Sequence, residues 1–430
     1  MIPILQFDRL APEDILNRDI QAEEDVSAAV DAVLAAVKAK GDAALKAYTK
    51  QFNGVELEDL QVSEAELDGA WRGLDPEFIR TLELAAENIR RFHEHQVHKD
   101  FVLTDRPGIL MGQRYTPIEK VGICVPSAPA AFPSTILMNV IPAKIAGVGE
   151  IVVVTPPDQN GAISPEALAA AKIAGADKIF KIGGAQAVAA LAYGTESVPR
   201  VDKVVGPGGI FVATAKRKVF GQVAIDMIAG PSEILVLADG KSDAAWVAAD
   251  LLSQAEHDVL ASPVLVTDSQ ELARAVQAEV ERQLELLPRR EVARRAVDDN
   301  GKIIVTDDLE KAVEAANLIA PEHLELCVDD PFALLPRVKN AGSIFLGRSA
   351  PEALGDYFAG PNHTLPTSGT ARFSSPLSVD DFVKKSSFLY YDQAALSPVA
   401  ERIAEFARRE GLEAHARSVL IRNEKGGNAP

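Results

Sequence analysis

Short runs of β-branched residues alternate with helix-patterned segments through the middle of the chain, and this alternation constrains the fold more than any other feature. The first series runs in this order: strand 151–155, helix 165–174, strand 178–182, helix 185–193, strand 201–205 and helix 210–219. Strands that are separated by helices pair in parallel, and the helices cover the faces of the sheet. We therefore expect a parallel sheet in this part of the chain.

A second series of the same kind follows. Its order is strand 233–238, helix 243–257, strand 263–267, helix 270–287, strand 302–306, helix 309–319, and strands 324–328 and 343–346. The 430 residues are also too many for one ordinary core. We expect an α/β protein with two Rossmann-like lobes and parallel sheets, joined near residues 229–232.

The lobes leave segments at both ends of the chain. We expect these parts: an N-terminal arm 1–20, a first lobe 21–105 with 234–377, a second lobe 106–233, and a helical C-terminal tail 378–430. Residues 373–397 lack an apolar period, which predicts an extended link before a helix at 398–410.

Local signals mark several element ends in the N-terminal quarter. Gly41 interrupts an apolar stripe over residues 24–52. Ser63 and Glu66 have the spacing of a capping box. Asp75 before Pro76 predicts a helix start, and the residues around Arg106-Pro-Gly108 predict a hairpin.

Composition excludes several classes of protein. The net charge is −18, and no basic cluster exceeds Lys216-Arg217-Lys218, which argues against a nucleic-acid partner. Two cysteines cannot form a disulfide framework. No apolar run reaches membrane-spanning length, and the first residues lack the pattern of a signal peptide. We expect a cytoplasmic protein without a membrane partner.

Four of the seven histidines each lie in a compact polar motif in the C-terminal half. The motifs are Gln254-Ala-Glu-His257, Pro321-Glu322-His323-Leu-Glu325, the segment 355–363 with Asp356 and His363, and Glu410-Gly-Leu-Glu-Ala-His415. Alone, each is explained by helix capping or turn chemistry. Four such segments together suggest one assembled site.

The residue types in these motifs suit metal and acid–base chemistry. Gln254 and His257 share one face of a helix, and a neutral imidazole is a good zinc ligand. Glu322 and His323 offer an adjacent acid and base beside a predicted strand. A rival metal motif, His93-Glu-His95-Gln-Val-His98, is interpreted as a solvated helix end.

Two glycine turns follow strands of the first series and open helices. They are Gly183-Gly184 and Gly206-Pro-Gly-Gly209. Backbone amides at such turns can hold a phosphate, but glycine also suits any tight turn between a strand and a helix. The dinucleotide-binding fingerprint is incomplete, because Phe211 stands where its third glycine would be. Both interpretations stay open from spacing alone.

The four histidine motifs, together with Ile228-Ala-Gly-Pro-Ser-Glu-Ile-Leu and Ile182-Gly-Gly-Ala-Gln186-Ala-Val-Ala-Ala-Leu-Ala-Tyr-Gly-Thr, resemble the histidinol dehydrogenases over nearly the whole chain. The resemblance implies a zinc- and NAD-dependent enzyme of histidine biosynthesis. Such enzymes oxidise L-histidinol through L-histidinal to L-histidine. They are homodimers in which the tail of one subunit, here 378–430, completes the site of the other, and 106–233 would be the lobe on the nucleotide side.

The resemblance also implies residue roles. One zinc ion per subunit would be held by Gln254, His257, Asp356 and His415. His323 would be the catalytic base, and Glu322 would activate water at the aldehyde stage. The substrate would contact the zinc ligands and His323, and also Ser232, His363 and Glu410.

The nucleotide pocket departs from the family pattern at two positions. Cys124, in Gly122-Ile-Cys-Val-Pro-Ser127-Ala128, stands where the family has tyrosine. Gly209 stands where the family has asparagine, whereas Gln186 matches. We expect Cys124, Gln186 and Gly209 to line the cofactor site.

Two other functions compete with this interpretation. One is a related dehydrogenase on the same scaffold that acts on another polyol, such as a sulfonated propanediol. A sulfonate site calls for Arg or Lys, whereas Asp356 and Glu410 complement a cation. The other is a two-lobed protein that binds a metal or ligand without catalysis, against which the Glu322-His323 pair argues.

Overall fold

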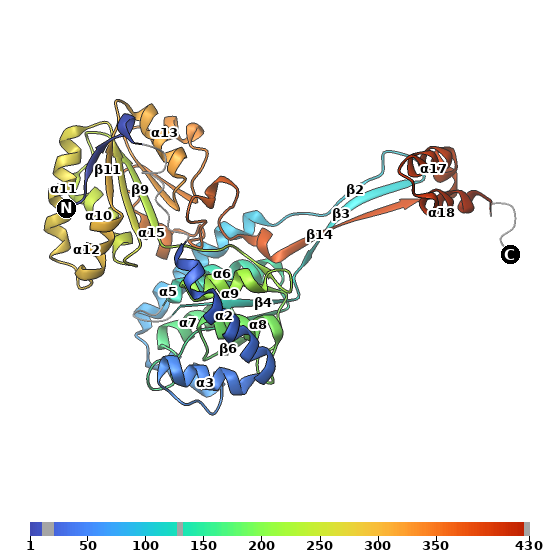
Figure 1. Cartoon of the computed structure of the whole chain (residues 1–430), viewed down its shortest axis with the longest axis horizontal. Coiled ribbons are helices and arrows are strands. Elements are labelled where there is room, and N and C mark those ends of the chain that lie inside the picture. Colours follow the sequence, from blue (N-terminus) through green and yellow to red (C-terminus); the bar gives the residue numbers. More distant parts are fainter. Residues whose placement is uncertain (11–20, 127–131, 425–430) are drawn as a thin grey trace. The chain divides into compact units, whose positions relative to one another are not determined.

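The computed structural model describes residues 1–10, 21–126 and 132–424, which form two compact units (Figure 1). Unit 1 contains Met1–Gln96 and Ile118–Phe382, and unit 2 contains Val97–Pro117 and Val383–Pro430. Part of the expected arm (11–20), Ser127 and Ala128 of the cysteine motif, and the end of the tail (425–430) lie outside the described residues. Within the described part, no helix combines the length and apolar character needed to cross a membrane.

A five-stranded parallel sheet forms one half of unit 1. In chain order its strands are β4 Lys120–Cys124, β5 Glu150–Val154, β6 Lys178–Phe180, β7 Lys203–Val205 and β8 Ala224–Ile225. The connecting helices are α6 Pro133–Ala146, α7 Pro165–Ala174, α8 Gly184–Tyr193 and α9 Ile210–Val219. The alternation of strand and helix thus produces the predicted parallel sheet, with α6 as a helix that we did not predict.

Four N-terminal helices cover both faces of this sheet. They are α2 Gln21–Lys40, α3 Asp42–Asn53, α4 Glu64–Gly73 and α5 Pro76–His93. α2 and α3 pack with α8 and α9 on one face, and α4 and α5 pack with α6 and α7 on the other. We expected this part of the chain to belong to the lobe of 234–377. An apolar stripe shows that a helix has a buried face but does not show which sheet it packs against.

The predicted helix ends in this region are confirmed. Gly41 separates α2 from α3 and has a φ of 51°, which favours glycine. Ser63 and Glu66 form a complete capping box at the start of α4. Asp75 caps α5, with Pro76 in its first turn.

A six-stranded parallel sheet forms the other half of unit 1. Its strands are β1 Ile4–Gln6, β9 Glu233–Ala238, β10 Ser262–Thr267, β11 Lys302–Val305, β12 His323–Cys327 and β13 Ser343–Leu346. Helices α10 Ala244–Ala255, α11 Gln270–Leu284 and α12 Arg290–Asp299 pack on one face, and α13 Leu309–Ile319 packs on the other. β1 lies within the expected N-terminal arm, and its pairing with β11 makes residues 4–6 part of this sheet.

Both sheets have the same topology. The five-stranded sheet has the order β6-β5-β4-β7-β8, and the six-stranded sheet has the order β11-β10-β9-β12-β13 with β1 added beyond β11. Numbered along the chain within each lobe, both orders are 3-2-1-4-5. This is the order of a Rossmann-like half, whose switch points here lie between β4 and β7 and between β9 and β12. The two predicted Rossmann-like lobes are therefore confirmed.

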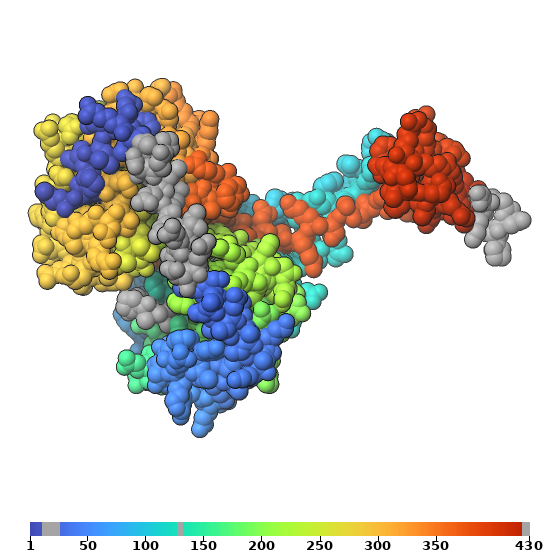
Figure 2. Space-filling view, in the orientation of Figure 1, coloured from blue at the N-terminus to red at the C-terminus, as the bar shows by residue number. Residues whose placement is uncertain are grey.

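Unit 2 is a three-stranded antiparallel sheet followed by short helices. The strands are β2 Phe101–Leu103, β3 Ile109–Pro117 and β14 Val383–Tyr391. The helices are α16 Gln393–Leu396, α17 Ala400–Arg409 and α18 Glu413–Glu424. Figure 2 shows these strands as a narrow arm that carries the compact pair α17 and α18.

The hairpin around Arg106-Pro-Gly108 is confirmed by the pairing of β2 with β3. The extended link expected over 373–397 is only partly correct, because 383–391 form the regular strand β14. Its register runs from Val383 opposite Pro117 to Tyr391 opposite Ile109. A strand whose partner lies more than 260 residues away carries no local signal of that pairing.

Candidate active site

The predicted acid–base pair lies at the start of β12, where β9 holds both side chains. The backbone N–H of Glu233 donates to Glu322 Oε2 at 2.9 Å. The Nδ1 atom of His323 donates to the Glu233 carbonyl oxygen, also at 2.9 Å. A carbonyl oxygen can only accept, so the proton of the neutral ring is on Nδ1 and Nε2 keeps its lone pair. One residue of β9 thus fixes both groups and sets the tautomer of His323.

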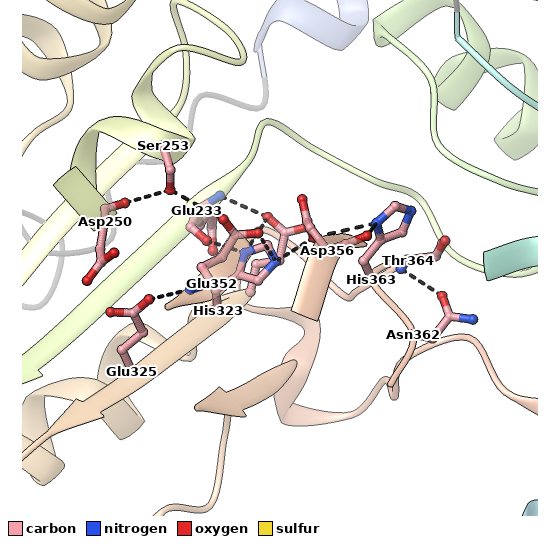
Figure 3. Close-up of polar contacts among 11 residues, drawn as sticks. Glu233, Asp250, Ser253, His323, Glu325, Glu352, Asp356, Asn362, His363 and Thr364 are labelled. Atoms are coloured by element: carbon pink, nitrogen blue, oxygen red, sulfur yellow. Dashed lines mark hydrogen bonds and ion pairs between the residues drawn. The ribbon is translucent and has the colours of Figure 1, made fainter. Parts of the chain in front are cut away.

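Two carboxyl groups from α15 (Glu352–Tyr357) surround the other ring nitrogen of His323. Glu352 Oε1 lies 3.7 Å and Asp356 Oδ1 lies 3.9 Å from His323 Nε2. Asp356 also receives a hydrogen bond at its backbone oxygen from His363 Nδ1, at 3.1 Å. Figure 3 shows these side chains meeting from β12, α15 and the segment that follows α15.

The protonation of these groups follows from their burial. Burial lowers the pKa of the His323 imidazole, so the ring is neutral near pH 7. Burial raises the pKa of the Glu322 carboxyl well above its usual value. Burial and then the charge of Asp356 raise the pKa of Glu352 to about 9. Burial also acts to raise the pKa of Asp356, but the hydrogen bond and charge of His363 hold it below its ordinary value.

The end of α10 brings Gln254 and His257 to the same site. Gln254 is buried, and its backbone carbonyl oxygen accepts a hydrogen bond from the backbone N–H of His257 at 3.1 Å. His363 also approaches the site, because its Nδ1 atom lies 3.5 Å from Asp356 Oδ1. Ser232 immediately precedes β9, and its carbonyl accepts from the backbone N–H of Ser262.

Glu410 and His415 belong to unit 2. Glu410 caps the C-terminus of α17, and His415 lies in the first turn of α18. Both side chains are exposed within their unit. The structure therefore brings together Glu322, His323, Asp356 and His363 of unit 1, while the two tail residues occupy the surface of the other unit.

Three buried polar atoms in this site have no hydrogen-bond partner among the described residues: Gln254 Nε2, His323 Nε2 and Glu352 Oε1. Buried polar groups without a partner are costly, so the site is built to receive a polar or charged species. Gln254, His257 and Asp356 supply an amide, an imidazole and a carboxylate, a mixed set of N and O donors that suits zinc. The residues of unit 1 therefore fit the implied metal.

Sequence reasoning missed two members of this site. Glu352 lies four residues before Asp356 on α15, and its ligand atom lies within 4.8 Å of those of His323 and Asp356. That helical spacing was visible in the sequence. Glu233 acts through its backbone, which residue chemistry does not reveal.

A second buried acidic group lies behind Glu352. Burial, then the nearby charge of Asp250, raises the pKa of Glu325 to about 9. Burial raises the pKa of Asp250 to about 6. Glu325 Oε1 accepts from the backbone N–H of Glu352 at 2.7 Å and so supports the start of α15.

The Glu322-His323 pair lies at the amino end of its strand, although ligands of parallel sheets usually bind at the carboxyl ends. The other lobe follows the usual rule. A cavity of about 250 Å³ opens beyond β4 and β5, and both predicted glycine turns line it with Gly183, Gly184, Gly208 and Gly209.

Cys124 also lines this cavity, next to the turn at Gly206. Burial raises the pKa of its thiol to about 12, so the thiol is neutral. Gly206 has a φ of 102°, and a Cβ there would lie 2.2 Å from the Cys124 carbonyl oxygen, so only glycine fits. Gln186 is buried in α8, one turn into the helix that begins at Gly184.

The interpretation of His93 as part of a solvated helix end is wrong. His93 is fully buried, and its Nδ1 lies 2.7 Å from Gln96 Oε1. His95 and His98 are exposed, as expected. The apolar stripe of α5 extends to His93 and carries it into the core.

Comparisons with known proteins identify the family to which this chain belongs. The family model for histidinol dehydrogenase matches residues 16–423. The chain is 53% identical to the histidinol dehydrogenase of Geobacillus kaustophilus over 424 residues, covering 98% of this chain and 100% of that one. It is 55% identical to that of Geobacter sulfurreducens over 411 residues, covering 95% and 96%.

A crystal structure of histidinol dehydrogenase from Elizabethkingia anophelis has the same fold. The TM-score is 0.93 at 37% sequence identity, and the match covers 99% of this chain and 98% of that chain. The fold and these full-length matches agree with one another, and the chain belongs to the histidinol dehydrogenase family.

Proposed function

We propose that the site around Glu322 and His323 oxidises L-histidinol to L-histidine in two successive steps, each of which reduces one NAD. Family membership makes the chain an NAD-dependent oxidoreductase of histidine biosynthesis. The observation that carries the residue-level proposal is the His323 ring. Its Nδ1–H is bound to Glu233, and its unpaired Nε2 faces Asp356 and Glu352.

His323 is the base in this proposal. A neutral ring whose Nδ1–H is held by a backbone carbonyl can take a proton only at Nε2. Asp356 is close enough to stabilise the imidazolium that forms when the alcohol loses its proton. The hydride leaves for NAD from the carbon that carries the alcohol oxygen. Removal of the hydroxyl proton and this hydride yields the aldehyde.

Glu322 acts in the second half of the reaction. The aldehyde must gain an oxygen from water before a second hydride can leave. Glu322 is held beside His323, because the backbone of Glu233 binds both side chains. Burial raises the pKa of the Glu322 carboxyl group, so its deprotonated form is a strong base toward a water molecule.

We assign Gln254, His257, Asp356 and His415 as the residues that would hold zinc. A bound zinc ion would orient the imidazole and amine of the substrate. The mixed N and O donors that these residues supply support this assignment. Ser232, His363 and Glu410 contact the substrate in the same proposal.

The cavity at the carboxyl ends of β4 and β5 takes NAD. It lies at the switch point of a Rossmann-like half and is lined by two glycine turns at helix starts. Cys124 and Gly209 line it directly, and Gln186 lies on the helix that one turn opens.

Unit 2 forms the dimer contact and supplies Glu410 and His415 to the site of the partner. Its sheet and helices expose large apolar side chains: Phe101, Val102, Leu103, Leu110, Phe388, Leu389, Tyr390, Ile403, Phe406, Leu412 and Ile421. The buried apolar cluster of its helices contains only Ala404, Ala407 and Ala416, with Leu420 packed against it. So much exposed apolar surface on so small a core marks a protein interface.

Steady-state NAD reduction tests the proposal, with L-histidinol as substrate and with a sulfonated propanediol as the competing substrate. The ionised Asp356 carboxylate gives the site a negative charge, which suits a cationic amino alcohol. NADH formation with the sulfonate and none with L-histidinol would overturn the assignment of L-histidinol as the substrate. A cytoplasmic location stays a prediction from the sequence.

A further inference from the structure

A buried ion pair lies beneath the glycine turn of the proposed NAD cavity. Lys216 of α9 contacts Asp226, which follows β8, and their side chains are 2% and 0% exposed. Neither residue has a role in the chemistry proposed above. Burying two charges is expensive, and an apolar pair of similar size would fill the same space at less cost. The pair therefore calls for an explanation other than core stability.

Both members of the pair bind the backbone of Gly206. Asp226 Oδ2 accepts from the Gly206 N–H at 2.7 Å, and Lys216 Nζ donates to the Gly206 carbonyl oxygen at 3.0 Å. Gly206 is the first residue of the turn whose next three residues line the cavity. Its φ of 102° and its close approach to the Cys124 carbonyl leave the turn little freedom on its other side.

The same pair connects this turn to the catalytic residues. Asp226 begins the segment 226–233, which crosses from β8 to β9 and ends at Glu233. Midway, the backbone N–H of Gly230 donates to Thr367 Oγ1 at 2.5 Å, and Glu233 holds Glu322 and His323. Seven residue steps span at most about 25 Å, so the chain itself limits the distance between the two sites.

We infer that Lys216 and Asp226 are positioning residues of the cofactor site: by holding both backbone groups of Gly206, they fix the 206–209 turn against the crossover segment that carries the partner of the catalytic pair. The inference rests on the proposed binding of NAD in this cavity. The pair acts through the turn, because its two members contact each other and bind the backbone of Gly206.

The test compares two double variants of the full-length, zinc-loaded protein. Lys216→Met with Asp226→Asn removes both charges together and leaves no donor for the Gly206 carbonyl. Lys216→Gln with Asp226→Asn is also neutral but keeps an amide donor and an acceptor. Calorimetric titration with NAD should show affinity reduced on the order of tenfold or more in the first variant and largely restored in the second.

A matched control is Lys203→Met with Asp381→Asn. Lys203 is a second buried lysine of this lobe, at the amino end of β7, and it is paired with Asp381 at 2.9 Å. Its ion pair does not involve Gly206. This control should bind NAD like the wild type, and all variants should keep wild-type zinc content.

The inference fails if the Met/Asn variant binds NAD as the wild type does. It also fails if the Met/Asn and Gln/Asn variants lose affinity equally, because the hydrogen bonds to Gly206 are then not the cause. Parallel losses of NAD and zinc affinity in the Met/Asn variant would show general unfolding and would likewise overturn it. If the wild type itself does not reduce NAD with L-histidinol, the proposed function fails instead.

Discussion

A single residue of β9 holds the two groups on which the proposed chemistry depends. The backbone of Glu233 binds both Glu322 and His323, so the relative position of acid and base does not depend on side-chain rotamers of a third residue. The sequence pointed to Glu322, His323 and most of their neighbours, because each lies in a motif of chemically active residues. It could not identify Glu233, which acts through its backbone, whereas the spacing of Glu352 to Asp356 was visible and was overlooked.

Replacing His323 by Asn should slow the oxidation of both L-histidinol and L-histidinal. Both steps require a base at the ring nitrogen, and loss of a general base commonly costs about 10²–10⁴-fold in rate. Separate assays of each substrate measure the two rates. His95→Asn is the matched control, because His95 is exposed on the surface of unit 1. Wild-type rates in His323→Asn would contradict the assignment.

Glu322→Gln should slow mainly the oxidation of L-histidinal and should change its pH dependence. Because burial raises the pKa of Glu322, the wild-type carboxyl loses its proton only at a pH above the usual range for Glu. The rate of aldehyde oxidation should therefore rise with pH through that folded-state pKa. His323 has a lowered pKa and is already neutral there. The variant should lose this rise, and a persisting rise would assign it to another group.

At the scale of elements, the alternating strands and helices were predictable because each carries its own apolar period. α7, α9, α13, β9 and β13 have the predicted bounds. β1 and β14 were missed because each is stabilised by a partner far away in the chain. In β1, Ile4 pairs with Ile303, and in β14, Val383 pairs with Pro117. α6 is buried along almost its whole length and has little amphipathic pattern to recognise.

The end of α10 provides a prediction at this scale, since it carries two proposed zinc ligands. His257→Ala should weaken zinc retention, because an imidazole is the strongest neutral ligand in the set. Dialysis against a chelator, followed by measurement of bound zinc, tests this directly. Stripping the wild type should abolish NAD reduction, and added zinc should restore it. Unchanged zinc content in His257→Ala would remove His257 from the set of ligands.

At the scale of the whole molecule, the chain consists of a large unit with Glu322 and His323 and a small unit with Glu410 and His415. The small unit has three short strands, an alanine cluster and many exposed aromatic and aliphatic side chains. Such a unit gains stability by association. In the proposed dimer, two-fold exchange of these units would cover the exposed apolar side chains of each small unit. It would also complete each site from two chains.

Mixing two inactive variants tests this shared site. His323→Ala damages the large unit, and His415→Ala damages the small one. In a mixed dimer with exchanged units, one site combines the intact large unit of the His415→Ala chain with the intact small unit of the His323→Ala chain. Random mixing makes about half of the dimers mixed, so about a quarter of wild-type activity should return.

The matched control mixes His323→Ala with His257→Ala, whose lesions both lie in the large unit. Every site in that mixture keeps one lesion wherever the small unit binds, so activity should stay absent. Mass analysis of differently tagged chains verifies that subunits have exchanged in both mixtures. If the first mixture also stays inactive although mixed dimers are present, each small unit serves its own chain. The proposed ligands Gln254, His257 and Asp356 would be unaffected by that result, because all three belong to the large unit.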